Sequence, residues 1–147
     1  MTVIIQPDQI STFMGAIKHM AVASGRIREI SAQTSMNRML YQILSGLYQC
    51  WIVFDDIDGE REMHAIALTC VAVDDITNER TLCIDAIYAW RPLTPDLADD
   101  AFNTVVSFAK ENKCVALKAD TSVPRAIDIL LGHGFKETMR SYRLEVD

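Results

Sequence analysis

The sequence predicts an α/β domain in which helices flank a mixed, mostly antiparallel sheet. Two observations support this fold class. First, apolar residues recur at helical spacing up to about residue 47, at strand spacing over residues 48–89, and at helical spacing again from residue 95. Second, short polar turns join the middle strands, whereas a helix separates residues 81–89 from the next strand, as in a parallel pair. We therefore expect the order β-α-α-β-β-β-α-β-α-β in one domain covering residues 1–147.

Composition limits the classes of partner. The chain has 147 residues, of which 50% are apolar and 23% charged, so it can bury a core as one compact domain. The net charge of −6 argues against a general binder of nucleic acid or of anionic membranes. No apolar run approaches the roughly 20 residues of a membrane span, and the chain start does not resemble a signal peptide. We expect a cytoplasmic protein with no nucleic-acid or membrane partner.

Four cysteines lie in apolar, strand-like runs: Cys50, Cys70, Cys83 and Cys114. No two of them form a C-x-x-C pair, and none has a histidine at metal-ligand spacing. We interpret them as buried thiols that pack as small apolar side chains in a reducing compartment, and we expect no metal.

The first half of the chain predicts a strand, two helices and a three-stranded meander. The strand, residues 1–6, is interrupted by Pro7, and Asp8 is a candidate N-cap for a helix that runs to about Ala23. Residues 26–30 fit either a loop or the first turn of a second helix, whose apolar positions span residues 36–47. The meander strands are expected at residues 48–54, 63–73 and 81–89, with an Asp-Gly turn at residues 58–59.

The second half predicts a capped helix, a short buried strand, a second helix and a terminal strand. Thr94 can cap the first of these helices, with Pro95 at its first position. A fully apolar run at residues 114–117 is typical of a strand that helices cover. The last helix can start at Thr121 or Ser122, and the alternation over residues 138–146 predicts the terminal strand.

Residues 123–135 read V-P-R-A-I-D-I-L-L-G-H-G-F. Together with the order of elements, this segment resembles the GNAT family of N-acetyltransferases, in which it often reads N-P-R-A-I-x-L-Y-E-K-L-G-F. The resemblance implies the GNAT fold, acetyl-CoA as cofactor in a gap beside the strand at residues 81–89, and acetyl transfer to an amine.

The resemblance also implies which residues contact acetyl-CoA. The strand end pairs with the pantetheine arm, and backbone N–H groups at the start of the next helix bind the pyrophosphate, because a helix N-terminus attracts anions. The implied cofactor-binding residues are Ile87, Tyr88, Ala89, Arg91, Thr94, Asp96, Leu97 and Arg125.

The pyrophosphate motif is degenerate. The family pattern is Q/R-x-x-G-x-G/A, and Arg91 fits its first position. Thr94 and Asp96 replace the small residues that let a phosphate approach the backbone. Pro95 removes one N–H donor, and the acidic charge at this helix start repels an anion.

One aspartate and two tyrosines are candidates for catalysis. Asp85 is the one acid in its strand and lies between apolar neighbours, so desolvation would raise its pKa and suit it to act as general base. The alternative is an acid on the open face of a half-solvated sheet. The tyrosine that the family often uses as acid is Leu130 here. Tyr142 on the expected terminal strand, or Tyr88 at the end of the central strand, could replace it; the alternative for each is an ordinary half-buried sheet tyrosine.

Two functions follow from these observations. The first is a GNAT-like N-acetyltransferase acting on an amine substrate. The second is a catalytically inactive GNAT-fold binding or structural module with a protein partner or a homo-oligomeric state, for example a phage accessory or virion protein. The family resemblance favours the first, and the degenerate motif favours the second.

Overall fold

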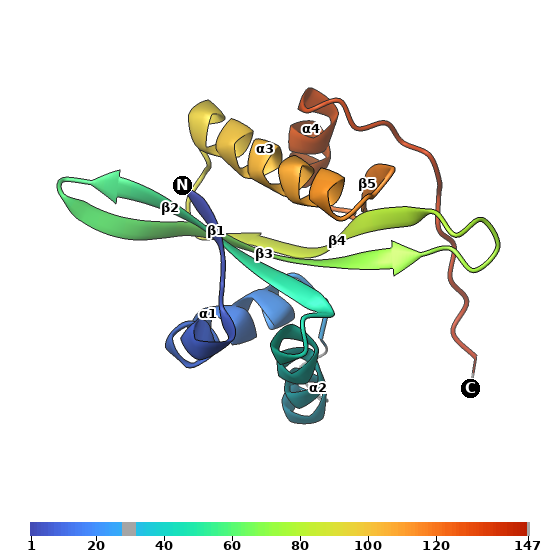
Figure 1. Ribbon diagram of the computed structural model, residues 1–147, viewed down its shortest axis with the longest axis horizontal. Helices are drawn as coiled ribbons and strands as arrows, with labels where there is room; N and C mark the ends of the chain where they lie inside the picture. The colour runs from blue at the N-terminus through green and yellow to red at the C-terminus, as the bar shows by residue number, and fades with distance from the viewer. Residues whose placement is uncertain (28–31, 147) are drawn as a thin grey trace.

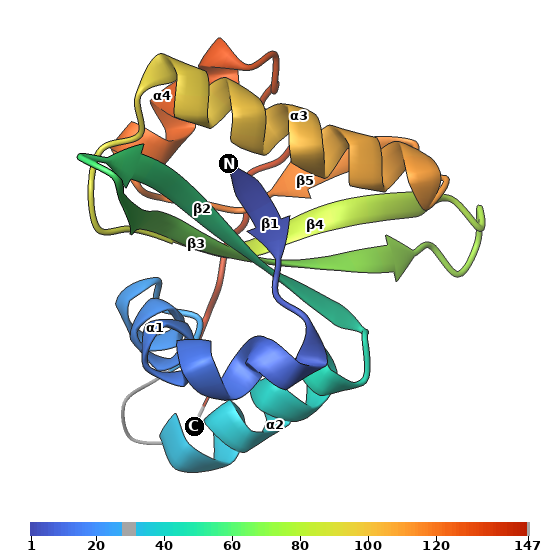
Figure 2. The same cartoon turned by 60° about the vertical axis from the view of Figure 1, so that its left-hand side comes forward.

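The computed structural model of the protein describes residues 1–27 and 32–146, and it has a sheet between two layers of helices (Figure 1). Helices α1 (Ile10–Ala23) and α2 (Ala32–Leu44) lie on one face of the sheet, and α3 (Pro95–Glu111) and α4 (Pro124–Gly132) lie on the other (Figure 2). The strands are β1 (Thr2–Ile4), β2 (Tyr48–Ile57), β3 (Glu60–Val73), β4 (Arg80–Ala89) and β5 (Ala116–Ala119). They are ordered β1-β2-β3-β4-β5, antiparallel except for the parallel pair β4–β5. The predicted mixed, mostly antiparallel sheet flanked by helices is confirmed.

The β2–β3 hairpin turns at Asp58 and Gly59, where the sequence predicts it. Both residues have positive φ, 51° and 80°, which is the backbone of a two-residue type I′ turn. The strands reach closer to this turn than predicted, because Asp55 to Ile57 pair with residues 60–62 of β3. The acidic residues of this segment therefore lie at the exposed end of a hairpin.

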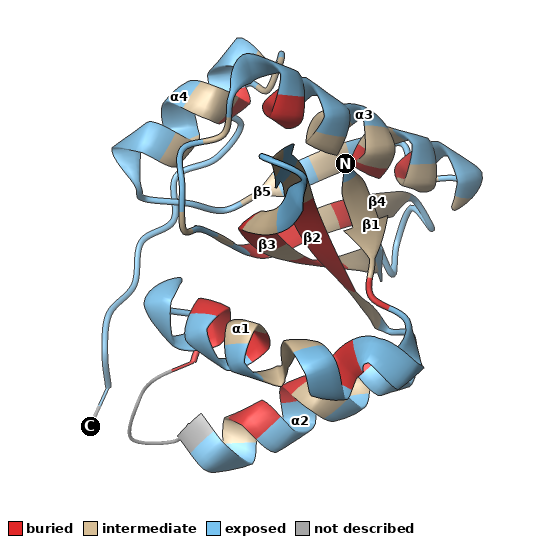
Figure 3. Ribbon diagram, turned by 90° about the vertical axis from the view of Figure 1, so that its left-hand side faces the viewer, coloured by how far each residue is buried: buried red, intermediate tan, exposed pale blue. Residues whose placement is uncertain are grey.

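The core is divided between the two faces of the sheet (Figure 3). On the side of α1 and α2, fully buried side chains include Ile17, Met20, Ile52, Ile66 and Leu68. On the side of α3, a smaller cluster contains Trp51, Leu82, Val105 and Ala109. Burying a large apolar side chain contributes about 1.5–3 kcal/mol, so both layers of helices are held mainly by these contacts.

The starts of the first two helices differ from the prediction. Asp8 is not a cap, because the chain enters through a 3-10 turn (η1, Pro7–Gln9) and α1 starts at Ile10. Gln9 precedes α1 without a side-chain capping bond to that helix, and its Oε1 accepts the backbone N–H of Gln6 at 2.9 Å within the 3-10 turn. The second helix starts at Ala32, four residues before its first buried methionine, and ends at Leu44. Of the ambiguous segment at residues 26–30, residues 28–30 lie outside the described part of the chain.

The two later helices start as their sequences allow. Thr94 caps α3, with its Oγ1 accepting the N–H of Leu97 at 3.3 Å and Pro95 at the first helical position, as predicted. Helix α4 starts at Pro124 without a side-chain cap, so the predicted cap is wrong. Thr121 instead accepts the N–H of Val123 at 3.2 Å, one residue before the helix.

The predicted terminal strand is wrong. Residues 135–146 form neither helix nor strand, and in the described part of the chain β5 pairs with β4 alone. In this segment Tyr142 is 88% and Leu144 86% exposed. Alternating side chains are compatible with a strand, but a strand also needs a neighbouring edge to pair with. Among the described residues, no helix is both long and apolar enough to cross a membrane.

Candidate functional site

Strand β5 pairs with only the first part of β4 and leaves the rest of this edge of β4 open, without a paired strand among the residues described. Residues 81–84 of β4 pair with residues 116–119 of β5, whereas β4 continues to Ala89. Asp85 is an extra residue in β4, because Leu68 of β3 faces Ala86 and the next residue, Thr69, faces Ile84. Such a bulge bends and twists its strand. Beyond it, residues 85–89 present backbone groups for which the described residues of β5 provide no partner.

The predicted cofactor-binding strand lies along this opening. Ile87, Tyr88 and Ala89 pair with residues 65–67 of β3 on one side, so the other side of their backbone faces away from the sheet. Ile87 is 45% exposed, whereas Tyr88 is half-buried. An extended ligand with amide groups could pair with this backbone as an added strand does.

An aromatic cluster of His19, Tyr88 and Trp90 lies at the end of β4. The Tyr88 ring meets the His19 ring edge-on at a centroid distance of 4.6 Å, and Trp90 lies 5.1 Å from Tyr88. His19 belongs to α1, so the cluster joins α1 to the junction that follows β4. This contact could not be predicted from the sequence, because nearly seventy positions separate His19 and Tyr88 along the chain.

The junction between β4 and α3 is attached to β3. The backbone N–H groups of Trp90 and Arg91 both point at the carbonyl of His64, at 2.9 and 3.5 Å. The Arg91 guanidinium pairs with the Glu62 carboxylate, and the two side chains are 52% and 32% exposed. Arg91 lies at the position where the resemblance implies a phosphate-binding side chain, but its guanidinium is already paired with a carboxylate.

The start of α3 offers few free donors. Pro95 has no N–H, and the N–H of Leu97 donates to Thr94. The Asp96 carboxylate is exposed in the same turn, where its negative charge interacts favourably with the positive end of the helix dipole but repels an anionic ligand. Neither Thr94 nor Leu97 is thus free to bind a pyrophosphate without breaking the cap.

Two further acids of α3 have structural roles that the sequence did not reveal. Asp100 accepts the hydroxyl of Thr2 at 2.9 Å and lies 3.5 Å from the N-terminal ammonium, so it attaches α3 to β1. Asp99 lies 3.0 Å from Nε2 of His133, whose Nδ1 lies 2.8 Å from the carbonyl of Ile129. His133 follows α4, and through Asp99 it joins α4 to α3.

Asp85, the candidate base, pairs with Arg26. The Nε of Arg26 donates to its Oδ2 at 2.8 Å, and the Asp85 side chain is 27% exposed. The hydrogen bond from Arg26 to Asp85 raises the pKa of Arg26. Asp85 could accept a proton from an amine only while sharing, or releasing, this arginine.

The other predicted site residues are exposed. Tyr142 lies in the segment after α4, and Arg125 lies in the first turn of α4. The structure therefore gathers Asp85 and residues 87–91 along β4 and its junction, with Thr94, Asp96 and Leu97 at the adjoining helix start. It does not bury Tyr142 or Arg125 in a site.

No group of three potential metal ligands occurs within residues 1–27 and 32–146. The sequence did not indicate that His64 is buried. It is 5% exposed, and neither of its ring nitrogens has a hydrogen-bond partner among the described residues.

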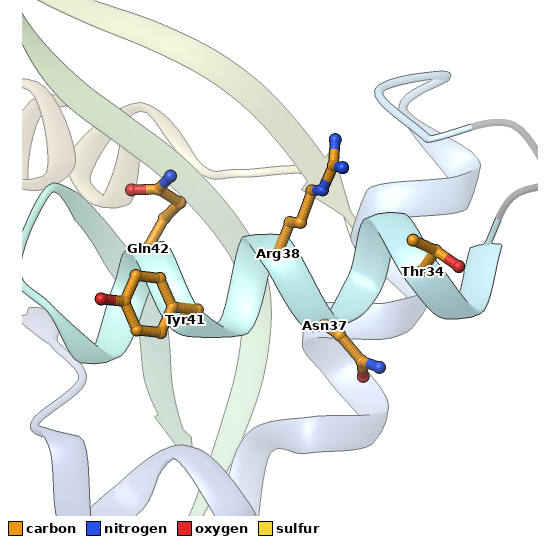
Figure 4. A pocket seen from close by; sticks show the side chains of 5 residues that line it. All are labelled: Thr34, Asn37, Arg38, Tyr41 and Gln42. Carbon is orange, nitrogen blue, oxygen red and sulfur yellow. The ribbon is translucent and has the colours of Figure 1, made fainter.

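Two open depressions lie elsewhere on the surface. One, of about 340 Å³, is lined by side chains of α2 alone: Thr34, Asn37, Arg38, Tyr41 and Gln42 (Figure 4). The other, of about 510 Å³, lies between β1 and α3 and includes Trp51 and Phe108 in its lining. Neither contains a predicted site residue.

Comparisons with known proteins identify the fold. No protein-family model and no curated protein matches the chain. A solved structure described as a probable acetyltransferase is 14% identical, with a TM-score of 0.74 over 100% of this chain and 98% of that one. A predicted acetyltransferase with acetyl-CoA, from Clostridium acetobutylicum, is 18% identical, with a TM-score of 0.73 over 99% and 95%. A GNAT family acetyltransferase from Staphylococcus aureus is 11% identical, with a TM-score of 0.67 over 99% and 98%. The chain has the GNAT fold.

Within this GNAT fold, the opening beside β4 is the place where the sequence resemblance expects acetyl-CoA. At this place β4 has a bulge at Asp85, and residues 87–89 have no pairing partner in the described residues of β5. At the residues that the resemblance expects on the phosphate side, the predicted Thr94 cap is present and occupies the Leu97 N–H, and Arg91 has a carboxylate partner that the sequence did not predict.

Proposed function

We propose that the protein is a cytoplasmic GNAT-fold N-acetyltransferase that binds acetyl-CoA beside β4 and transfers the acetyl group to an amine. The observation that carries the proposal is the end of the β4–β5 pairing at Ile84, which leaves the backbone of residues 85–89 open on one side. The C. acetobutylicum neighbour, whose structure is described with acetyl-CoA, supports the choice of cofactor.

The chain's own groups then have distinct roles. Backbone groups of residues 87–89 hold the amide-containing arm, and Asp85 takes a proton from the amine, directly or through water. The amine nitrogen forms a bond to the acetyl carbon, the carbon–sulfur bond breaks, and the thiolate leaves and is protonated. Tyr142 is the candidate donor of that proton, and it can act only if the segment after α4 moves onto the opening.

The altered phosphate side predicts an unusual pattern of affinity. Acetyl-pantetheine lacks the pyrophosphate and adenosine of acetyl-CoA, so the comparison isolates the contribution of Arg91 and of the start of α3. We expect the two dissociation constants to agree within about tenfold, or about 1.4 kcal/mol. Calorimetric titration measures both, and a thermal shift with either ligand gives an independent readout. The absence of any binding at millimolar concentration of both ligands would overturn the proposal.

Releasing Arg91 should restore part of the phosphate affinity. In Glu62→Gln the guanidinium loses its charged partner, so acetyl-CoA should bind severalfold more tightly while acetyl-pantetheine is unaffected. Asp56→Asn is the matched control, because it removes a similar carboxylate–arginine pair, with Arg61, from the same hairpin. A gain in Asp56→Asn equal to that in Glu62→Gln would mean that only the net charge matters.

The second candidate function is a catalytically inactive binding or structural module, such as a phage accessory or virion protein. The observation that favours it is that three functional groups of the site already have partners: Asp85 with Arg26, Arg91 with Glu62, and the N–H of Leu97 with Thr94. Under this hypothesis the protein binds neither acetyl-CoA nor acetyl-pantetheine, and it co-purifies with a partner, or with itself, in fixed stoichiometry.

A further inference from the structure

A row of four side chains crosses the sheet next to the bulge in β4. Tyr48 of β2 is the register partner of Cys70 of β3, Cys70 is the partner of Cys83 of β4, and Cys83 is the partner of Lys118 of β5. Directly opposed residues on neighbouring strands present their side chains on the same face of a sheet. Cys70 and Cys83 therefore form a cross-strand pair of cysteines.

Neither cysteine of this pair is fully buried, which differs from the buried thiols that the sequence predicts. Cys70 and Cys83 are half-buried, whereas Cys50 is 0% exposed. Opposed residues in an antiparallel pair have Cβ atoms about 4.5–5.5 Å apart, and a disulfide needs about 3.5–4.5 Å. The two strands thus need only a small local adjustment to bring the sulfur atoms into bonding distance.

We propose that Cys70 and Cys83 form a reversible disulfide by exchange with a low-molecular-weight disulfide such as oxidised glutathione. One cysteine thiolate attacks a sulfur of the oxidant, forms a mixed disulfide and releases one glutathione thiolate. The second cysteine attacks the protein sulfur of that mixed disulfide, so a protein S–S bond forms and a second glutathione leaves. Two protein thiols are oxidised and one glutathione disulfide is reduced to two thiols. This exchange does not depend on acetyl transfer.

The surroundings of the pair set the pH dependence of the exchange. Burial is the main cause that raises the pKa of Cys70 and of Cys83, and the charge of Asp85 adds to it. The charges of Lys118 and Arg26 act in the opposite sense, on Cys83 and Cys70 respectively. Two further groups face the pair, Tyr48 beside Cys70 and Asp120 beside Cys83. Because the thiolate is the attacking form, the rate of oxidation should rise steadily from pH 7 to pH 9.

The sequence allows a direct test on the full-length protein. The protein is incubated with defined ratios of oxidised to reduced glutathione, quenched with acid, alkylated and digested with trypsin. Arg80 lies between the two cysteines, so cleavage places Cys70 in residues 62–80 and Cys83 in residues 81–110, because trypsin does not cleave the Arg91–Pro92 bond. The expected result is a disulfide-linked pair of these two peptides, which dithiothreitol separates, with Cys50 still alkylated only after unfolding, since burial raises its pKa to about 12.

Variants separate the proposal from general thiol oxidation. Cys70→Ser and Cys83→Ser should each stop at a single glutathione adduct, because no second thiol is opposed to the first. Cys114→Ser is the matched control and should oxidise like the unchanged protein, since Cys114 lies outside the row. Accumulation of glutathione adducts without the linked peptides, or linkage through Cys50 or Cys114, would overturn the proposal, as would no oxidation of the folded protein under conditions that oxidise it when unfolded.

Discussion

The ion pair with Arg26 determines how Asp85, the candidate base, can act. Asp85 has apolar neighbours in the sequence, and from these alone one expects a carboxyl group whose burial disfavours its charge. The structure adds a guanidinium at 2.8 Å from a residue 59 positions away, which stabilises the charged form. Asp85 can therefore act as a base only while it shares this contact with Arg26 or gives it up.

Replacing Asp85 distinguishes a base from a structural ion pair. Asp85→Asn keeps the shape of the side chain and removes its charge. If Asp85 is the base, acetyl transfer at saturating substrates should fall about 100-fold or more. The pair is partly exposed, so the free energy of unfolding should change by less than about 1 kcal/mol. Steady-state rates and urea unfolding measure the two effects, and full activity in Asp85→Asn would exclude it as the base.

A second residue-scale prediction concerns a buried polar chain under α3. The Trp51 indole N–H donates to the Thr69 hydroxyl at 2.9 Å, and that hydroxyl donates to Oε1 of Gln49 at 3.0 Å. Trp51 and Thr69 are 3% and 1% exposed. Thr69→Val keeps the volume but leaves the indole N–H unpaired, which should cost about 1–3 kcal/mol in urea unfolding. Thr69→Ser keeps the hydroxyl and is the control. Equal losses in both variants would show that packing, not the hydrogen bond, matters here.

At the scale of elements, the N–H group of Leu97 at the start of α3 has two possible partners, the Thr94 cap or a phosphate, and it cannot serve both. Thr94 stabilises the helix by accepting the N–H of Leu97, which a phosphate would also need. Thr94→Gly removes the cap and frees this N–H, and it should lower the free energy of unfolding by only a few tenths of a kcal/mol. Acetyl-CoA should then bind severalfold more tightly, with no change for acetyl-pantetheine. Thr94→Ser, which keeps the cap, should bind like the unchanged protein; tighter binding in this variant would contradict the explanation.

The elements that sequence predicted well are those whose signals are local. The Thr94 cap, the Asp58–Gly59 turn and the apolar face of α3 depend on residues a few positions apart. The pairs that define the candidate site could not be predicted in this way, because Arg26 with Asp85 and Arg91 with Glu62 are brought together only by the complete sheet.

The failure of the terminal strand has a related cause. The alternation in residues 138–146 is a local signal, but strand formation depends on an edge elsewhere in the molecule, and the described residues of β5 do not pair with this segment. The motif-based prediction of the cofactor position used the order of elements, and it stays a prediction. It points to the part of β4 that β5 leaves unpaired, but it could not show that Arg91 has a carboxylate partner.

At the scale of the whole molecule, the segment after Phe135 should contribute little to stability. Phe135 still packs edge-on against Phe102 at a centroid distance of 5.8 Å, whereas Tyr142 is 88% exposed. For a chain that ends at Phe135, the free energy of unfolding in urea should lie within about 0.5 kcal/mol of the value for the full-length protein.

The same truncation tests the candidate acid. If Tyr142 protonates the leaving thiolate, the shortened chain and Tyr142→Phe should lose acetyl transfer to the same extent. Retained activity in Tyr142→Phe would exclude this role. A large loss of stability in the shortened chain, by contrast, would show that this segment packs against the folded domain.

The arrangement of the sheet also has a kinetic consequence. Strands β2, β3 and β4 follow one another in the chain, whereas β1 pairs with β2 through partners as distant as Thr2 and Val53. Hairpins close in about 1–10 μs, and pairing across a long loop is slower because more chain entropy is lost. Substituting Gly59 should therefore slow refolding, while substituting Val3 should mainly speed unfolding, in stopped-flow measurements over a range of denaturant. The three-stranded meander would then be the folding nucleus, formed before the strand next to it is recruited from the start of the chain.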